Sequence, residues 1–132
     1  EFNIFDEGLN PSKAKDIERL RSNLGVVLYE SNLLSAKGPR KMKVYAPEVN
    51  ENTSEIYQFK PLSEKEGILS NFKTGKRAGI KEFTNKNPKW NDQLQAFVLN
   101  FNGRVEKPSV KNFQLIDERS DDRIYLQFGR VT

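Results

Sequence analysis

The stretch that decides the fold runs from residue 95 to residue 116 and reads QAFVLNFNGRVEKPSVKNFQLI. Phe97, Leu99 and Phe101 alternate with other residues, which places them on one face of a β-strand. The pair Asn102-Gly103 follows directly, and these two residue types accept the positive φ angles of a tight turn. The composition from residue 110 onward is again apolar and aromatic. The stretch therefore predicts a strand, a turn and a second strand.

Outward from this stretch, short strands and punctuated loops continue along the chain. Apolar alternation marks residues 2–5, and we expect further strands at 24–29, 41–46, 55–62, 77–83 and 124–131. Ser63 and Glu66 have the spacing of a capping box, and Ile68, Leu69 and Phe72 follow at helical spacing. We therefore expect one short helix at about 63–73. Residues 12–21 offer another turn or two of helix with a thin apolar face.

Composition narrows the functional classes. The chain has 132 residues, of which 36% are hydrophobic and 30% charged, so residues 1–132 are expected to form a single globular domain. It contains no cysteine and no histidine, which excludes disulfides, thiolate nucleophiles, histidine bases and the zinc or haem sites built on these residues. A carboxylate metal site is the remaining metal option. We expect a binding protein, with no enzymatic activity, no cofactor and no metal.

Charge favours an anionic partner. Lys and Arg number 22 against 18 Asp and Glu, which gives a formal net charge of +4 and a pI of about 9.3. Basic residues concentrate at 37–43 and again at 73–89. Such runs are usually solvated faces, and a binding patch is the alternative.

Two apparent motifs fail on inspection of their spacing. Residues 73–76 read KTGK, but a phosphate loop needs glycine where Ser70 stands and serine or threonine where Arg77 stands. The acidic run at 117–122 lacks the alternate spacing and the central glycine of a calcium loop, and Arg119 interrupts it. We therefore expect no nucleotide site, and a solvated loop in place of a calcium site.

A set of motifs carries more information than composition does. They are, in chain order, Phe5-Asp6 with Gly8, Asn10-Pro11, Tyr29-Glu30-Ser31-Asn32, Lys37-Gly38-Pro39-Arg40-Lys41-Met42, Asn87-Pro88-Lys89-Trp90-Asn91-Asp92, the segments FNGRV and SVKNFQ within 101–114, and Leu126-Gln127-Phe128-Gly129-Arg130-Val131. In type and order they resemble the tubby C-terminal domain family across essentially the whole chain. Residues 106–108 depart from the family pattern, and residues 48–86 match it poorly, which suggests a divergent member.

The resemblance implies a mainly β fold, an antiparallel barrel closed around a hydrophobic central helix. The first strands of the family domain would precede residue 1, and its last strands and central helix would follow Thr132. We therefore expect 1–132 to be an incomplete, partial barrel without that central helix. We also expect that the missing barrel elements or another chain complete the fold.

The resemblance also implies binding of phosphatidylinositol 4,5-bisphosphate in membranes. In the family a basic strand near the domain start holds the headgroup together with an Arg on a following strand. The basic strand falls ahead of residue 1, and the Arg maps onto Arg21. Because residues 19–23 themselves resemble the basic strand, Arg19 is a weaker candidate, as are Lys37 and Arg40. Arg suits this role since its planar fork donates two parallel hydrogen bonds to one phosphate.

Further expectations follow from the same resemblance. The protein would be a membrane-tethered adaptor for ciliary or membrane-protein trafficking, with ciliary transport machinery or membrane-receptor cargo as partners. It would be cytoplasmic and peripheral at the plasma membrane, with the cilium and the nucleus as further locations. The alternative is a DNA-binding, transcription-regulating basic module. Nucleic acid is the less favoured partner because no exposed aromatic residues interleave the basic runs.

Overall fold

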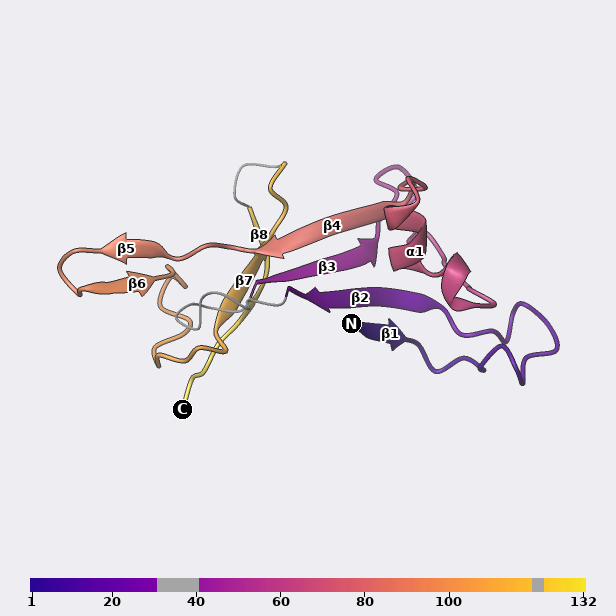
Figure 1. Cartoon of the computed structure of the whole chain (residues 1–132), viewed down its shortest axis with the longest axis horizontal. Coiled ribbons are helices and arrows are strands. Elements are labelled where there is room, and N and C mark those ends of the chain that lie inside the picture. The colour runs from indigo at the N-terminus through magenta and orange to yellow at the C-terminus, as the bar shows by residue number, and fades with distance from the viewer. Residues whose placement is uncertain (31–40, 120–122) are drawn as a thin grey trace. The chain divides into compact units, whose positions relative to one another are not determined.

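The computed structural model describes residues 1–30, 41–119 and 123–132, and Figure 1 shows its elements. The chain divides into two compact units. Unit 1 comprises Glu1–Tyr29 and Lys43–Glu82, and unit 2 comprises Glu30–Met42 and Phe83–Thr132. Candidate residues Lys37 and Arg40 lie outside the described residues.

The structure is mainly antiparallel β with one short α-helix, as predicted. The strands are β1 (Phe2–Phe5), β2 (Asn23–Tyr29), β3 (Met42–Pro47), β4 (Ile80–Asn85), β5 (Lys89–Asn91), β6 (Ala96–Val98), β7 (Phe113–Ile116) and β8 (Ile124–Phe128), and the helices are the 3-10 turn η1 (Glu64–Glu66) and α1 (Ile68–Lys73). The strand order is β1-β2-β3-β4-β7-β8, and β5 and β6 form a separate hairpin. The pairs β1/β2, β4/β7, β7/β8 and β5/β6 are antiparallel. This order closes no barrel among the described residues, which is consistent with the expected partial barrel.

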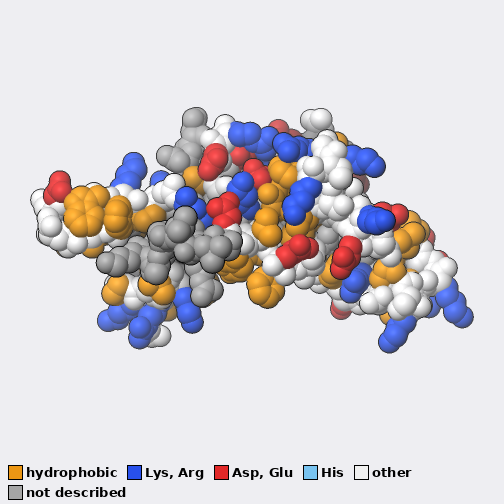
Figure 2. Space-filling view, in the orientation of Figure 1, with side chains coloured by type: hydrophobic (Ala, Val, Ile, Leu, Met, Phe, Trp, Pro, Cys, Tyr) orange, Lys and Arg blue, Asp and Glu red, His pale blue; other side chains and the backbone are white. Residues whose placement is uncertain are grey.

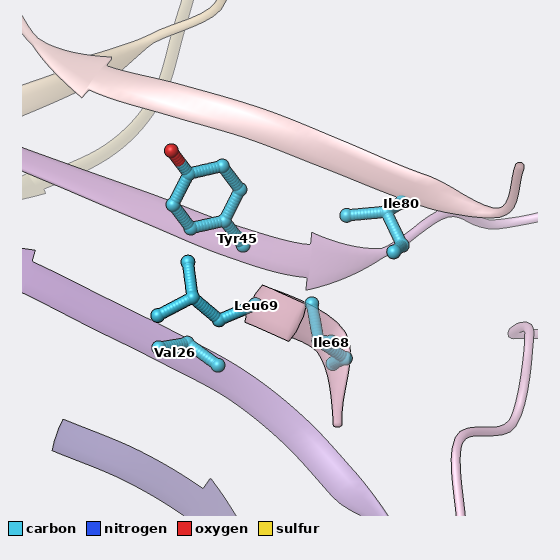
Figure 3. Close-up of a cluster of buried hydrophobic side chains, with 5 residues drawn as sticks. All are labelled: Val26, Tyr45, Ile68, Leu69 and Ile80. Atoms are coloured by element: carbon cyan, nitrogen blue, oxygen red, sulfur yellow. The ribbon is translucent and has the colours of Figure 1, made fainter. Parts of the chain in front are cut away.

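Unit 1 has a hydrophobic core between its strands and α1. Figure 3 shows Val26 of β2, Tyr45 of β3, Ile80 of β4, and Ile68 and Leu69 of α1, all of them buried. Burying an aliphatic side chain of this size contributes about 1.5–3 kcal/mol before the entropic cost of ordering it. This packing, more than helix propensity, explains how a six-residue helix is stable here.

The predicted helix at 63–73 is confirmed in position but is divided at Gly67. The N–H of Gly67 closes η1 on the carbonyl of Glu64, and α1 then begins at Ile68. The capping box is wrong in detail, because Ser63 makes no side-chain cap and the Glu66 carboxylate accepts the N–H of Leu62 at 2.9 Å. The cap of α1 comes from a strand instead, as described below.

Two predicted elements are wrong. Residues 12–21 form turns, not a helix, and the segment is held by a parallel bridge between Leu9 and Leu20. Its thin apolar face leaves too little surface to pack a helix. Residues 55–62 form no strand beyond one bridge between Ile56 and Val49. Ile56 is exposed, and Pro61 lacks the N–H that a ladder needs.

In unit 2 the predicted strands exist but are shorter than their sequence patterns. Residues 95–101 supply only the three residues of β6, which pair with β5, a strand that the sequence analysis did not predict. The predicted turn is confirmed, since Asn102 and Gly103 have φ of 52° and 79°. The strand predicted at 110–116 begins only at Phe113, because residues 109–112 form a turn in which the N–H of Asn112 bonds the carbonyl of Ser109.

Candidate anion-binding pocket

Unit 1 contains an open pocket with a volume of about 810 Å³. Its walls come from β1, from the turn at 10–12, from the start of β2 and from the segment that runs through η1 into α1. The lining residues used below are Phe5, Arg21, Asn23, Leu62, Ser63, Glu64, Lys65 and Lys73. The pocket is therefore assembled from four separate segments of the sequence.

Arg21 is held in place by contacts of both its backbone and its side chain. Its backbone N–H donates to the carbonyl of Leu9 at 2.9 Å, and its guanidinium carbon lies 3.7 Å from the centre of the Phe5 ring. The Nε atom is buried and has no hydrogen-bond partner among the residues that the structure describes. When a guanidinium stacks on an aromatic ring, its N–H groups point outward in the guanidinium plane and not into the ring, so stacking does not use them. Arg21 therefore retains unused donor capacity in the wall of the pocket.

The chain must cross itself closely to place Arg21 there, and Gly8 permits the crossing. A Cβ atom built at Gly8 would lie 2.4 Å from Cα and 2.6 Å from N of Arg21, far closer than real Cβ contacts. Only a residue without a side chain fits at this position without moving the backbone of Arg21. The absence of a side chain at Gly8 therefore allows the backbone of Arg21 to lie where it does.

The carboxylate of Asp6 holds the two chain segments together at the same crossing through hydrogen bonds. Its Oδ1 accepts the backbone N–H of Ser22 at 2.9 Å and that of Gly8 at 3.0 Å. These two hydrogen bonds, that from Ser22 first, stabilise the carboxylate and hold the pKa of Asp6 below its ordinary value of 3.8. The ionised side chain thus ties the loop after β1 to the residue that follows Arg21.

Asn23 connects the arginine side of the pocket to the helical side. Its side chain is almost fully buried, its Nδ2 donates to the carbonyls of Ile4 and Gly25, and its Oδ1 accepts the N–H of Ile68 at 3.1 Å. This last bond caps the first N–H of α1, a role usually filled by a residue next to the helix in sequence. One asparagine therefore sets β1, β2 and α1 in register around the pocket.

The charged lining is mixed with a basic excess. The lining includes the basic residues Arg21, Lys65 and Lys73 and the carboxylates of Glu1 and Glu64. This set can bind an anion through charge-assisted hydrogen bonds. It offers no nucleophile paired with a base. Among the described residues, no cluster of three His, Cys, Asp or Glu could hold a metal ion.

The structure brings together only part of the predicted site. Arg21 lines the pocket, whereas Arg19 does not; Arg19 points into an exposed ion pair with Asp16 at 3.9 Å. Neither Lys65 nor Lys73 was predicted as a site residue. Lys73 begins the basic run at 73–89, for which a binding patch was the alternative, and Lys65 lies in the segment predicted to be helical. Their approach to Arg21 depends on the bond between Asn23 and Ile68, which no local pattern reveals.

Membrane spanning by a helix has no support in the described residues. No helix there is both long enough and apolar enough to cross a bilayer.

Comparison with known proteins gives a consistent result. A model of the Tub family matches residues 1–132. The chain is 42% identical to human Tubby-related protein 2 over 98% of its own length and 25% of that protein, and 44% identical to mouse Tubby-related protein 3 over 98% and 29%. It is 43% identical to Tubby protein homolog 1 of Caenorhabditis briggsae over 99% and 32%. The chain thus spans between a quarter and a third of these relatives, and none of the three is named as an enzyme.

Proposed function

Because the chain belongs to the Tub family, we propose that its pocket binds the phosphorylated headgroup of phosphatidylinositol 4,5-bisphosphate in a membrane. The observation that carries the proposal is the state of Arg21. A guanidinium held against Phe5, with a buried Nε that lacks a partner among the described residues, lies in the wall of an open pocket that Lys65 and Lys73 also line. A buried polar atom without a partner is costly, and a side-chain rotation that brought Nε to a phosphate oxygen would remove that cost.

The expected mechanism is recognition without chemistry. Arg21 donates charge-assisted hydrogen bonds to one phosphate, and such bonds contribute about 1.5–3 kcal/mol. Lys65 and Lys73 add attraction of about 1 kcal/mol each near an anionic leaflet. Binding of this strength is reversible, so the protein would leave the membrane when the lipid is hydrolysed. No base or nucleophile in the pocket would act on the lipid, and we propose that the protein is not an enzyme.

For the whole protein we propose an adaptor role in the trafficking of membrane proteins, the cilium included. It would lie in the cytoplasm and at the plasma membrane, and its partners would be transport machinery and receptor cargo. We further propose that other barrel elements or another chain complete the fold around this segment. Each of these proposals needs its own experiment.

Three variants of the whole protein test the lipid site. Arg21→Ala should weaken binding to vesicles that contain the bisphosphate lipid by about 10- to 150-fold, the equivalent of 1.5–3 kcal/mol. Arg21→Lys keeps the charge and loses the fork, so it should recover only part of the affinity. Arg104→Ala is the matched control, since Arg104 is an exposed residue in a turn of unit 2.

The measurement is vesicle flotation with and without the bisphosphate lipid, together with a salt-dependent DNA mobility shift. Equal losses for Arg21→Ala and Arg104→Ala would show diffuse charge attraction in place of a site. A DNA shift that exceeds lipid binding at physiological salt would favour the nucleic-acid alternative.

A further inference from the structure

One side of the pocket presents an apolar residue to solvent. Leu62 lines the pocket, yet its side chain is 63% exposed. It does not sit on a free loop, because Pro61 before it is buried and its own N–H donates to Glu66 Oε2 at 2.9 Å. A lone exposed leucine is ordinary on a protein surface, so its meaning depends on what surrounds it.

A second exposed aliphatic residue is tied to the same end of unit 1. Ile17 is 69% exposed, and Lys60 Nζ donates to the carbonyls of Ile17 and Glu18 at 3.1 and 3.3 Å. These bonds join the loop between β1 and β2 to the segment that leads into η1. In Figure 1 both segments lie at the end of unit 1 that carries η1, and Figure 2 shows hydrophobic side chains among Lys and Arg there.

The charge of these two segments suits an anionic surface. Residues 12–21 carry four basic and two acidic side chains, and residues 60–73 carry three basic and two acidic ones. Apolar side chains bordered by lysines match the two layers of a bilayer interface. The aliphatic groups reach the acyl boundary, and the long lysine stems leave their ammonium groups at the level of the phosphates.

We propose that Leu62, with Ile17 on the adjoining loop, inserts into the surface of an anionic phospholipid bilayer while the pocket holds a headgroup. The proposal rests on the proposed function, since Leu62 belongs to both the pocket and the exposed apolar site. It adds a second attachment that a soluble headgroup cannot use. Stable attachment of a peripheral protein generally needs two such signals.

The first test separates insertion from headgroup recognition. In the whole protein, Leu62→Ser and Ile17→Ser should each reduce affinity for vesicles that contain the bisphosphate lipid by about 5- to 10-fold, because part of one aliphatic side chain no longer leaves water. Ile17 is not one of the residues that line the pocket, so Ile17→Ser should change the affinity for the water-soluble inositol phosphate headgroup by less than about 2-fold. Leu94→Ser is the matched control, a leucine of unit 2 that is 66% exposed, and it should change neither affinity.

The second test reports insertion directly. Leu62→Trp in a Trp90→Phe background should show a blue-shifted emission on vesicles and quenching by brominated acyl chains, measured as the difference from the Trp90→Phe parent. Equal losses of vesicle and headgroup affinity for Ile17→Ser would overturn the proposal, because Ile17 would then act on the pocket and not on the bilayer. Absence of quenching on bound vesicles would overturn it too.

Failure of the proposed function would look different. In that case the unmodified protein would not bind the soluble headgroup at all. The Leu62→Trp variant would then be measured on phosphatidylserine vesicles. Quenching there supports insertion without a headgroup site, and no quenching rejects insertion as well.

Discussion

The two units of the chain differ in the core that buries their apolar side chains. In unit 1, α1 covers the sheet, and the five residues of the core are each less than 7% exposed. In unit 2, no helix is described, and several aromatic and aliphatic side chains of β6 and β8 are exposed to solvent. Phe97 is 64% exposed, Leu126 is 50% exposed and Phe128 is 56% exposed. Both units also expose large hydrophobic side chains, ten in unit 1 and eight in unit 2 among the described residues, so the units differ in the helix-covered core of unit 1 and not in the number of exposed apolar residues.

The comparison explains where a ligand site can form. A pocket with fixed side chains needs walls that are held by packing, and Asn23 and the core of unit 1 supply them. The ring pairs of unit 2, Trp90 with Phe97 and Phe113 with Phe128, stabilise local pairs of strands but cover little of their faces. We therefore place the anion site in unit 1, and we propose that the apolar faces of unit 2 are covered in the whole protein.

The largest expected effect concerns residues 1–132 expressed alone. Among the described residues, eighteen large hydrophobic side chains are exposed and ten hydrophobic residues are buried. We expect this segment to aggregate or to bind a hydrophobic dye and melt without a sharp transition, because so small a core does not offset the entropic cost of folding. Calorimetry and light scattering measure this. A monomer with a sharp cooperative melt would show that residues 1–132 fold without any further element to cover the apolar faces of unit 2.

The next effect concerns the core of unit 1 in the whole protein. Ile68 is fully buried, so Ile68→Ala should lower the free energy of unfolding by about 2–5 kcal/mol. Ile56 is the matched control, an isoleucine of the same unit that is 60% exposed, and Ile56→Ala should cost under about 1 kcal/mol. Urea denaturation of both variants is the measurement. Similar losses at the two positions would contradict the distinction between core and loop in unit 1.

Local patterns predicted most of the strands but little of the site. The alternation of Phe97, Leu99 and Phe101 and the Asn102-Gly103 turn depend on neighbouring residues, so they could be found from sequence. The failed strand at 55–62 had a suitable composition and no partner strand, which only the tertiary structure decides.

The residues of the candidate site could not be predicted from local sequence patterns either. Arg21 was identified by resemblance, not by its own pattern. Lys65 and Lys73 could not be placed beside it, because the capping bond from Asn23 to Ile68 spans 45 residues. Gly8 was recognised as part of a family motif, but its role could not be predicted, since the need for glycine arises from contact with Arg21.

The smallest effect concerns pH and the crossing that holds Arg21. The pKa of Asp6 is lowered in the folded protein by hydrogen bonds from Ser22 and Gly8, so the ionised form stabilises the folded state. This contribution is complete above the ordinary pKa of 3.8 and is lost as the pH falls through the lower folded value. Asp6→Asn should therefore lower the urea midpoint of the whole protein slightly at pH 7, and the difference from the unmodified protein should shrink in acid.

Asp92→Asn is the control for this measurement, because Asp92 lies in the hairpin of unit 2 and its carboxylate accepts a hydrogen bond from the exposed indole of Trp90. If the carboxylate of Asp6 acts through the position of Arg21, Asp6→Asn should also weaken vesicle binding at neutral pH, while Asp92→Asn should not. A constant stability difference between Asp6→Asn and the unmodified protein from pH 7 into acid would contradict the electrostatic role. It would leave Asp6 as a neutral acceptor at the crossing, and the position of Arg21 would then depend on Gly8 and Phe5 alone.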